Sequence, residues 1–585
     1  MSKLAPTAQR IAIAIASILL IAGCASGGGS APETAAAAAA APDTDLATPA
    51  ERSGYTATTP FDTVVAYLQK LVRYASIDST AGRNNRKGIP SLYVGIAGIT
   101  TEKRALPYVV LARPMVRSGR EAHASGRPVV YIEANIHAGE VEGKEAMLAL
   151  IRDLGVRGAP GAASVLDSIV IVVVPIYNAD GNERFAPQAV NRAEQNGPEQ
   201  VGERANAQHL DLNRDFVKAE APETRTTLAM FRDWDPDVFV DLHTTDGSFH
   251  GYALTYAPSL NPGALFTGPY TRDSLLPVLR QRMRERHHFE IFDYGNFEPA
   301  RTPGPDTARH SWQTYDGRPR FGTNYVGLRN RIAILSEAYS HDPFARRVAS
   351  TYAFVREILS VVAERRAQIL RLTASADSTV VDWGTHPGGG AAIPLTEVFA
   401  PSRGNEPVLV EDLERVAGPG GDSALTEPGV PRGQRRTGRI HLVPMPVIDR
   451  FAPVLTDRLP RAYLVPAKDT AVIRLLRLHG IEMRSLRADT SVTAAEQFHI
   501  DSVQFATTVF EGHHEASVTG RWQAAPGDLT IPAGTQFVPG AQRLGVVAMY
   551  LLDPRSDDGF VTWNLFDREL APGREYPVVR LVGKP

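Results

Sequence analysis

Short runs of β-branched apolar residues alternate with longer stretches of helical periodicity between about residues 54 and 373. The clearest run is Ile169 to Tyr177, IVIVVVPIY, whose unbroken apolar character suits a strand covered on both faces. Further strands are predicted at 129–136, 237–242 and 330–335, and helices at 141–154, 222–234 and 343–372. Such alternation predicts an α/β fold with a mixed or parallel sheet flanked by helices. Polar residues at the carboxyl ends of its strands are therefore the first candidates for a site.

The character of the chain changes after about Thr373. Gly- and Pro-rich stretches then separate short β-like runs, among them Ala462 to Val465 and Leu544 to Leu552. One helical piece, Ala471 to Leu478, is followed by Gly480, which fits a helix C-cap. A chain of 585 residues is also too long for one ordinary core. We therefore expect a separate β-rich accessory domain in this part of the chain.

The amino terminus has the pattern of an export signal. Lys3 and Arg10 precede an apolar run, Ile11 to Gly23, which is shorter than the ~20 residues of a membrane span. The run ends at Cys24, the single cysteine, in a stretch that resembles the bacterial lipobox, where the cysteine is lipidated. The alternative is an ordinary cleaved signal with an incidental Cys24. We expect an exported protein, lipid-anchored to the outer membrane and facing the periplasm or the cell surface.

Composition completes the expected division of the chain. The predicted segments are a signal peptide at 1–24, a disordered Ala/Gly/Ser/Pro tether at 25–53, an α/β domain at 54–373 and an accessory domain at 374–585. With one cysteine no internal disulfide can form. Basic and acidic residues nearly cancel, 62 against 64, and no Lys/Arg-rich run occurs. Nucleic acid is therefore not an expected partner, and no oligomeric state is predicted.

A metal-ligand spacing recurs along the chain. His-x-x-Glu occurs at His137/Glu140, His287/Glu290 and His479/Glu482. The spacing alone is therefore weak evidence, and the surroundings must separate the three. His287 lies among charged residues of a predicted helix end, and His479 precedes the capping glycine. His137 instead follows directly on a buried-looking strand, and Gly139 permits a tight turn there, so this pair can be both rigid and open to a ligand.

A third ligand is available at His243. It ends the apolar run DVFVDL, at the end of another predicted strand. Catalytic zinc uses three protein ligands and keeps one position open, and two histidines with one glutamate are a known set. The alternative is a hydrogen-bonded structural histidine. The pattern predicts one zinc ion per chain, bound by His137, Glu140 and His243.

Glu337 stands at the end of another apolar run, in AILSE. A carboxylate there is costly to bury unless it is paired or functional. It could serve as the general base of a hydrolytic reaction. The alternative is a salt bridge, for example to Arg329 or Arg331.

Asn213 and Arg214 supply an amide and a guanidinium within HLDLNRDF. A guanidinium fork binds a carboxylate through two parallel hydrogen bonds, which suits the free carboxyl end of a peptide. The alternative is a solvated loop.

These motifs together resemble the zinc carboxypeptidase family, the carboxypeptidase A-like metallopeptidases. The matching segments are HAGE at 137–140, NADG at 178–181, LNRD at 212–215, DLHT at 241–244 and LSEAYS at 335–340. Their order and rough spacing agree across about residues 60 to 370. The resemblance implies a mixed eight-stranded sheet flanked by helices and a peptide substrate.

The resemblance also implies roles for particular residues. Asn213 and Arg214 resemble the binders of the terminal carboxylate, and Glu337 resembles the general base. Family members carry an arginine that polarises the scissile carbonyl, for which Arg192 is preferred and Arg204 competes. A mobile family tyrosine corresponds to Tyr315 by spacing, with Tyr325 also possible.

Two other functions stay open. One is an amidase or peptidase of the same fold that acts on peptidoglycan stem peptides. The other is an inactive binding lipoprotein on this scaffold, although every ligand and base position is filled. Departures from the family pattern leave the substrate side chain unspecified. The adjacent His513 and His514 suggest a second metal, but neighbouring residues of a strand point to opposite faces, so structural roles are favoured.

Overall fold

The computed structural model describes residues 44–81, 91–298, 310–416, 430 and 433–583. From Asp45 onward the chain forms one compact unit. The predicted signal peptide, the lipidation site Cys24 and tether residues 25–43 lie outside the described residues. Residues 44–53, predicted as part of the disordered tether, contain two short helices, η1 (Thr44–Leu46) and α1 (Pro49–Arg52). Thr48 begins α1 with a reciprocal capping box to Glu51, and Ala50 is buried.

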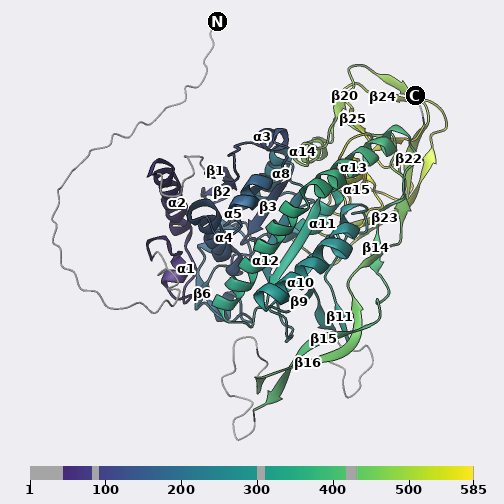
Figure 1. The fold of residues 1–585 in the computed structure, drawn as a ribbon. Helices are drawn as coiled ribbons and strands as arrows, with labels where there is room; N and C mark the ends of the chain where they lie inside the picture. Colours follow the sequence, from purple (N-terminus) through teal and green to yellow (C-terminus); the bar gives the residue numbers. More distant parts are fainter. Residues whose placement is uncertain (1–43, 82–90, 299–309, 417–429, 431–432, 584–585) are drawn as a thin grey trace, which may run out of the picture. The chain divides into compact units, whose positions relative to one another are not determined.

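A mixed eight-stranded sheet forms the centre of the fold (Figure 1). Its order is β1 (Leu92–Ile99), β2 (Ala105–Leu111), β4 (Val170–Val174), β3 (Val129–Ala134), β7 (Val238–Thr244), β12 (Ile332–Ala338), β8 (Leu254–Pro258) and β9 (Ile291–Asp293). The central strands β4, β3, β7 and β12 run parallel, whereas β1, β2 and β8 pair antiparallel with their inner neighbours. The sheet predicted from the family resemblance is confirmed.

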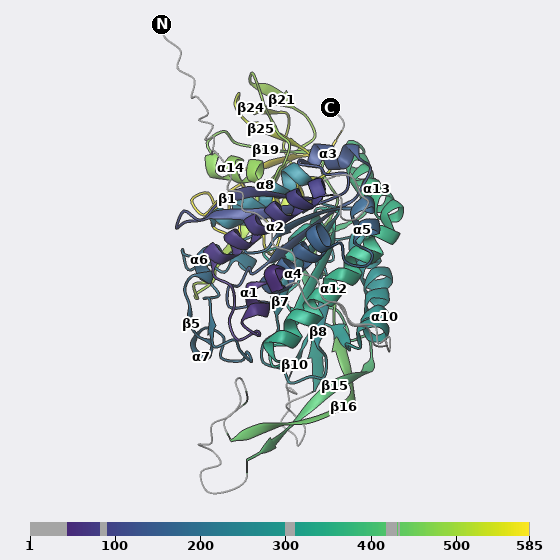
Figure 2. The same ribbon diagram turned by 60° about the vertical axis from the view of Figure 1, so that its left-hand side comes forward.

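Helices cover both faces of this sheet because its central strands are apolar on both sides. Along β3, Val130 and Ile132 pack with α2 (Phe61–Ala81), α4 (Glu142–Arg152) and α12 (Phe344–Glu364), which Figure 2 shows on one face. Tyr131 points to the other face, toward α8 (Pro222–Trp234). The remaining helices are α3 (Gly119–Ala124), α5 (Ala162–Ser168), α6 (Ala179–Asn182), α7 (Gln188–Asn191), α9 (Thr267–Tyr270), α10 (Leu276–His287), α11 (Gly322–Leu328), η2 (Asp153–Arg157), η3 (Leu212–Arg214) and η4 (Thr271–Leu275).

The C-terminal part is rich in strands, as predicted, and contains a six-stranded antiparallel sheet. Its order is β20 (Arg484–Ser485), β25 (Gln536–Pro539), β19 (Ala462–Val465), β26 (Val579–Leu581), β22 (Ala495–Phe505) and β23 (Ala516–Ala524). Helix α14 (Thr470–Leu478) ends before Gly480, whose φ of +81° confirms the predicted cap. Trp563 and Phe560 of this part share one apolar core with Phe216 and α8.

Smaller sheets complete the fold, and one of them combines strands of the α/β part and of the C-terminal part. One contains β10 (Asn296–Glu298), β11 (Ser311–Gln313), β16 (Gln434–Ile448) and β15 (Asn405–Arg415). The two-stranded pairs are β5 (Ala186–Pro187) with β6 (Gln200–Val201), β13 (Ile393–Pro394) with β18 (Thr456–Asp457), β14 (Glu397–Phe399) with β17 (Phe451–Pro453), and β21 (Thr490–Val492) with β24 (Leu529–Ile531). No helix among the described residues combines the length and the hydropathy of a membrane span.

Two predicted elements differ from the structure. The run 544–552, predicted as β-like, is helix α15 (Gly545–Leu552). All eight of its residues are buried, so the run is apolar without a period and its sequence does not distinguish helix from strand. The predicted helix 343–372 is divided at Arg365 into α12 and α13 (Arg366–Thr385). The predicted domain boundary at 373/374 therefore lies inside α13, and the division into domains stays a prediction.

Candidate metal centre and active site

Three parallel strands bring the predicted site residues to one edge of the sheet. In the register of these strands, Glu337 of β12 lies beside His243 of β7, and Asp241 of β7 lies beside Glu133 of β3. His137 follows the end of β3 by three residues, in the turn that leads to α4. The carboxyl ends of β3, β7 and β12 thus meet where the sequence predicted the site.

The turn that carries His137 depends on two residues. Asn135 has a φ of +66°, and its side chain donates to the carbonyl oxygens of Ala138 (3.2 Å) and Glu140 (3.3 Å). At Gly139 a β-carbon would lie 2.9 Å from the carbonyl oxygen of Gly202, closer than real contacts allow. A tight turn and close backbone packing therefore hold His137 and Glu140 in place.

The three predicted ligands form one buried cluster. Their donor atoms lie within 4.8 Å of one another, and this is the single group of its kind found in the described parts of the chain. Glu140 Oε1 lies 2.9 Å from His137 Nδ1, and Glu140 Oε2 lies 3.1 Å from His243 Nδ1. The two Nδ1 atoms are 3.2 Å apart. Two imidazole nitrogens and a carboxylate are the donor types that zinc prefers.

Carboxylates behind the histidines fix the orientation of both rings. His137 Nε2 lies 3.0 Å from Asp211 Oδ1, and His243 Nε2 lies 2.9 Å from Asp241 Oδ2. With a metal ion bound, each Nε2 would keep its proton toward its carboxylate and each Nδ1 would present a lone pair to the ion beside Glu140. Three donor groups converge in one buried cluster, and a cation among them would offset the negative charge of Glu140. The residues present therefore fit a metal ion.

Sequence reasoning missed Asp211 and Asp241, although both stand within the quoted motifs LDLNRD and DLHT. Asp241 precedes His243 by two residues on one strand, which puts both side chains on the same face. That spacing was a usable signal. Asp211 had none, because 73 residues of intervening chain separate it from His137.

Electrostatics differ sharply between the two glutamates of the site. Burial opposes charge on Glu140, but His137 and Arg192 outweigh it and hold its pKa well below the usual value. Burial raises the pKa of Glu337 well above its usual value, and the charge of Glu140 adds to this shift. The carboxylate form is thus favoured at Glu140, whereas burial favours the protonated form at Glu337.

Glu337 has none of the alternative salt bridges considered from the sequence. Arg331 pairs with Asp235 and Asp377, and Arg329 donates to the carbonyl oxygen of His479. Glu337 is 9% exposed and lines a small cavity of about 90 Å³. The cavity is bordered by His137, Glu140, Arg204, Asn213, Arg214, His243, Thr244, Asp246, Tyr294, Tyr315, Phe321, Leu335 and Glu337.

Asn213 and Arg214 lie in η3 and border the same cavity. The Asn213 side-chain oxygen accepts from the backbone N–H of Gly322 (2.9 Å). The Arg214 guanidinium lies 4.0 Å from the centre of the Phe321 ring and donates to the Asn213 carbonyl oxygen (2.9 Å). Phe321 and Gly322 therefore hold the side chains of Arg214 and Asn213 in place. The remaining N–H groups of the Arg214 guanidinium stay available to a substrate.

The two candidate arginines occupy different places. Arg192 is buried behind Glu140, donating to Glu140 Oε1 (3.1 Å) and to the carbonyl oxygens of Thr244 and Thr245. It does not border the cavity, so its guanidinium is committed to the metal ligand rather than directed at a substrate. Arg204 does border the cavity, and Asp211 holds it through two hydrogen bonds of 3.0 and 2.8 Å. The preference for Arg192 as the carbonyl-polarising group is not supported by this placement.

The two candidate tyrosines also lie in different places. Tyr315 borders the cavity, with its hydroxyl 2.8 Å from the hydroxyl of Thr323. Tyr325 is buried in α11, where its hydroxyl lies 2.8 Å from His479 Nδ1. The reason is helical geometry, because α11 turns Tyr325 toward the C-terminal core.

His287 and His479 of the other His-x-x-Glu spacings, and the adjacent His513 and His514, have protein partners. His287 lies 2.9 Å from Glu357, and His479 Nε2 lies 3.0 Å from the Val217 carbonyl oxygen. His513 contacts Glu220 and Asn564, while His514 contacts the Ala506 carbonyl oxygen. The structural roles expected for His513 and His514 agree with these contacts.

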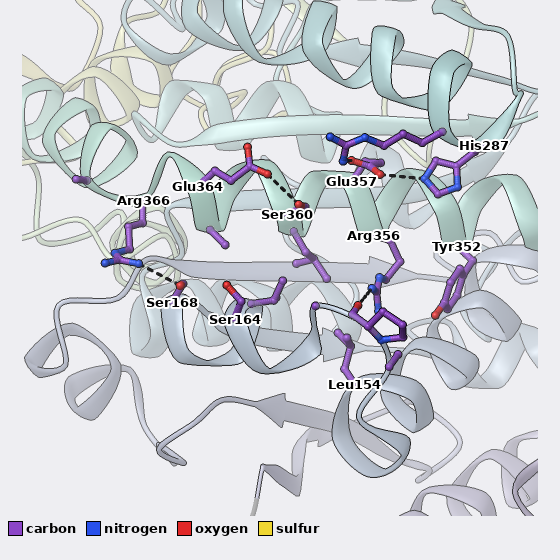
Figure 3. A pocket seen from close by; sticks show the side chains of 18 residues that line it. Leu154, Ser164, Ser168, His287, Tyr352, Arg356, Glu357, Ser360, Glu364 and Arg366 are labelled. Carbon is purple, nitrogen blue, oxygen red and sulfur yellow. Dashed lines mark hydrogen bonds and ion pairs between the residues drawn. The ribbon is translucent and has the colours of Figure 1, made fainter.

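A larger groove, about 800 Å³, lies between α5, α10 and α12 (Figure 3). Its polar groups are paired with one another: Glu357 with His287, Arg366 with Ser168 (3.1 Å) and Arg356 with the Pro160 carbonyl oxygen (2.7 Å). It contains none of the predicted site residues. Size alone therefore does not identify the functional site.

Parts of the chain are similar to known proteins. Residues 86–275 match the family model described as zinc carboxypeptidase. Carboxypeptidase 2 of Trichophyton equinum is 23% identical over 501 residues, which cover 82% of this chain and 81% of that protein. Carboxypeptidase D of Homo sapiens is 28% identical over 164 residues, 26% of this chain and 11% of that protein. The solved metallo-carboxypeptidase from Burkholderia cenocepacia aligns with a TM-score of 0.34 and 18% identity, covering 50% of this chain and 69% of that one.

The fold and the buried ligand cluster define a metallopeptidase-type site at the edge of a mixed α/β sheet. Residues 86–275 match the zinc carboxypeptidase family, and the protein is a zinc metallocarboxypeptidase. The matched segment contains His137, Glu140 and His243, while Glu337 lies beyond it.

Proposed function

We propose that this enzyme hydrolyses the last peptide bond of a peptide and releases the carboxyl-terminal residue. The observation that carries the proposal is the shared cavity, which Glu337 borders together with the metal-ligand cluster, Arg204 and Arg214. A base, a place for a Lewis acid and cationic groups for a carboxylate are thus available to one substrate.

Substrate orientation follows from the fixed cationic groups. Arg214 offers a planar fork to the terminal carboxylate, and Asn213 adds an amide donor. Both are held by protein contacts before a substrate arrives, through Phe321 and Gly322. Such preorganisation reduces the entropy lost on binding and places the scissile bond near Glu337.

The reaction divides between two side chains. A bound zinc ion supplies a Lewis acid and makes a nearby water more acidic, with a pKa of ~7. Glu337 accepts the proton of the attacking water at its carboxylate and returns it to the departing amine as the carbon–nitrogen bond breaks. We propose Arg204 rather than Arg192 as the group that stabilises negative charge on the carbonyl oxygen, because Arg204 borders the cavity.

The general base must be ionised before it can act. Burial alone favours the protonated form of Glu337. A divalent cation at the neighbouring ligands is the largest local charge and favours the carboxylate form. The two effects oppose one another, which suits a group that gains and loses a proton in each turnover.

Glu337→Gln tests the base directly. We expect kcat to fall by about 10²–10⁴-fold, while zinc content stays at one per chain. Zinc analysis and steady-state kinetics on a peptide with a free carboxyl end give both quantities. Full activity of the variant contradicts the mechanism.

A matched pair of peptides tests the exopeptidase assignment. The two peptides share one sequence and differ only in a free or an amidated carboxyl end. We expect cleavage of the free peptide and little cleavage of the amidated one, because Arg214 then lacks a carboxylate partner. Equal cleavage of both removes the carboxypeptidase assignment and favours the amidase.

Location is a proposal from the sequence. We propose that the protein is exported and lipidated at Cys24, on the basis of the apolar run and the lipobox-like segment. Metabolic labelling with a fatty acid tests this, with Cys24→Ser as the control. Equal labelling of both proteins contradicts the anchor, and so does labelling of neither.

A further inference from the structure

A tight turn of the C-terminal part lies against the catalytic part. Residues 506–515 connect β22 to β23, and the backbones of Phe510 and His513 exchange two hydrogen bonds of 2.8 and 2.9 Å. Glu511 and Gly512 form the tip, with φ values of +49° and +82°. Glycine adopts such values freely, whereas a glutamate does so only where other contacts hold it.

Glu511 has such a contact, and it reaches the metal centre through one residue. Its Oε2 accepts a hydrogen bond from the backbone N–H of Asp211 (3.1 Å). The side chain of the same Asp211 accepts from His137 Nε2 (3.0 Å) and from Arg204 (2.8 Å). A residue of the C-terminal part therefore holds the backbone of the group that orients a zinc ligand and an arginine of the cavity.

Contacts of His513 and Glu515, which follow the tip, also hold the turn in place. His513 Nε2 lies 3.1 Å from Glu220 Oε1. Glu515 Oε1 lies 2.6 Å from Arg320 Nη1, and Arg320 directly precedes Phe321, the ring beneath Arg214. These anchors place the tip whether or not Glu511 makes its own hydrogen bond, so Glu511 can be changed without detaching the turn.

We propose that Glu511 is a positioning residue of the active site, acting through Asp211 on His137 and Arg204. The inference rests on the proposed function for its effect on turnover, but not for its effect on zinc affinity. The physical reason is that removal of the acceptor leaves the Asp211 N–H without its partner and lets the Asp211 backbone shift. The partners of metal ligands typically change metal affinity by 10–100-fold when altered.

Three variants of the full chain distinguish a positioning role of Glu511, acting through Asp211, from a role only in docking the turn against the catalytic part. Glu511→Ala removes the acceptor. Glu511→Gln keeps an oxygen at the same reach and changes only the charge. His514→Ala alters the neighbouring exposed residue, whose ring contacts Ala506 within the turn, and serves as the matched control.

Zinc affinity by chelator competition, kcat, KM and melting temperature are measured for each. We expect Glu511→Ala to bind zinc roughly 10-fold more weakly and to lose several-fold in kcat, with Glu511→Gln near wild type. His514→Ala is expected to match wild type in every measurement. Wild-type zinc affinity in Glu511→Ala overturns the proposal, and so does an equal loss in Glu511→Gln, which would assign the effect to charge.

Failure of the proposed function gives a different result. If wild type binds zinc but cleaves no peptide with a free carboxyl end, the reaction assignment fails. The zinc affinities of the three variants still decide the role of Glu511. A fall in melting temperature without a change in zinc affinity assigns Glu511 to docking alone and overturns positioning.

Discussion

The edge of the eight-stranded sheet and the C-terminal part both bury histidines, but they treat them differently. His479 is surrounded by protein partners, because Tyr325 contacts its Nδ1 and the Val217 carbonyl oxygen contacts its Nε2. His137 and His243 instead share the Glu140 carboxylate on their Nδ1 sides, where the two Nδ1 atoms lie 3.2 Å apart, and each has a second carboxylate on its Nε2 side. The two ring nitrogens of His479 thus have separate protein partners, whereas His137 and His243 turn Nδ1 toward one shared carboxylate, an arrangement that a bound cation would complete.

The largest expected effect is that of removing one of the proposed metal ligands. His243→Gln removes one ligand, so we expect zinc content to fall well below one per chain and activity to drop below detection. His513→Gln, in the C-terminal part, is expected to retain zinc because its partners are Glu220 and Asn564. Metal analysis after dialysis compares the two, and zinc loss in both would contradict the distinction.

A second pair of variants distinguishes the roles of Arg204 and Arg192 within the site. Arg204→Gln is expected to lower kcat by about 10²-fold, because one donor to a developing negative charge is lost. Arg192→Gln is expected to weaken zinc binding instead, since Arg192 contacts Glu140 Oε1 at 3.1 Å. Kinetics at saturating zinc separate them. A larger loss of kcat in the Arg192 variant would restore that arginine as the carbonyl-polarising group.

Arg214→Lys tests a smaller effect. Lysine keeps the charge but loses the planar fork, so we expect KM for a free carboxyl end to rise roughly 10-fold with a smaller change in kcat. Arg477→Lys, on the surface of α14, is the control. An unchanged KM in the Arg214 variant would remove this residue from the carboxylate site.

The smallest expected effect concerns the pH dependence of stability that His479 causes. Burial lowers the pKa of His479 to about 3, below the ~6.5 of an unfolded chain. Between these values the unfolded state binds more protons, so stability is lost as pH falls below about 6.5, by about 2 kcal/mol at pH 5. The melting temperature of His479→Gln should therefore fall less than that of wild type between pH 7 and pH 5. The exposed His386→Gln is the control, and identical slopes for all three proteins would contradict this.

The sequence predicted the metal ligands and the base because His243 and Glu337 lie at the ends of apolar strands, His137 and Glu140 follow another, and strand ends of one sheet converge. Arg192, preferred from the sequence, and Tyr325, the alternative to Tyr315, do not border the cavity, since spacing along a loop or helix does not fix the direction of a side chain. Arg192 turns behind Glu140, and Tyr325 turns toward His479. The apolar run of α15 carried no period from which its conformation could be read.

The sequence itself determined the alternation of strands and helices, with His243 and Glu337 at strand ends and His137 and Glu140 in the turn after a strand, through periodicity and the cost of buried charge. The tertiary structure alone decided which carboxylates orient the histidines and which arginine borders the cavity. It also brought Glu511 to Asp211 across 300 residues of sequence separation. Such contacts arise when packed elements meet, and no local pattern in the chain encodes where two distant loops will touch.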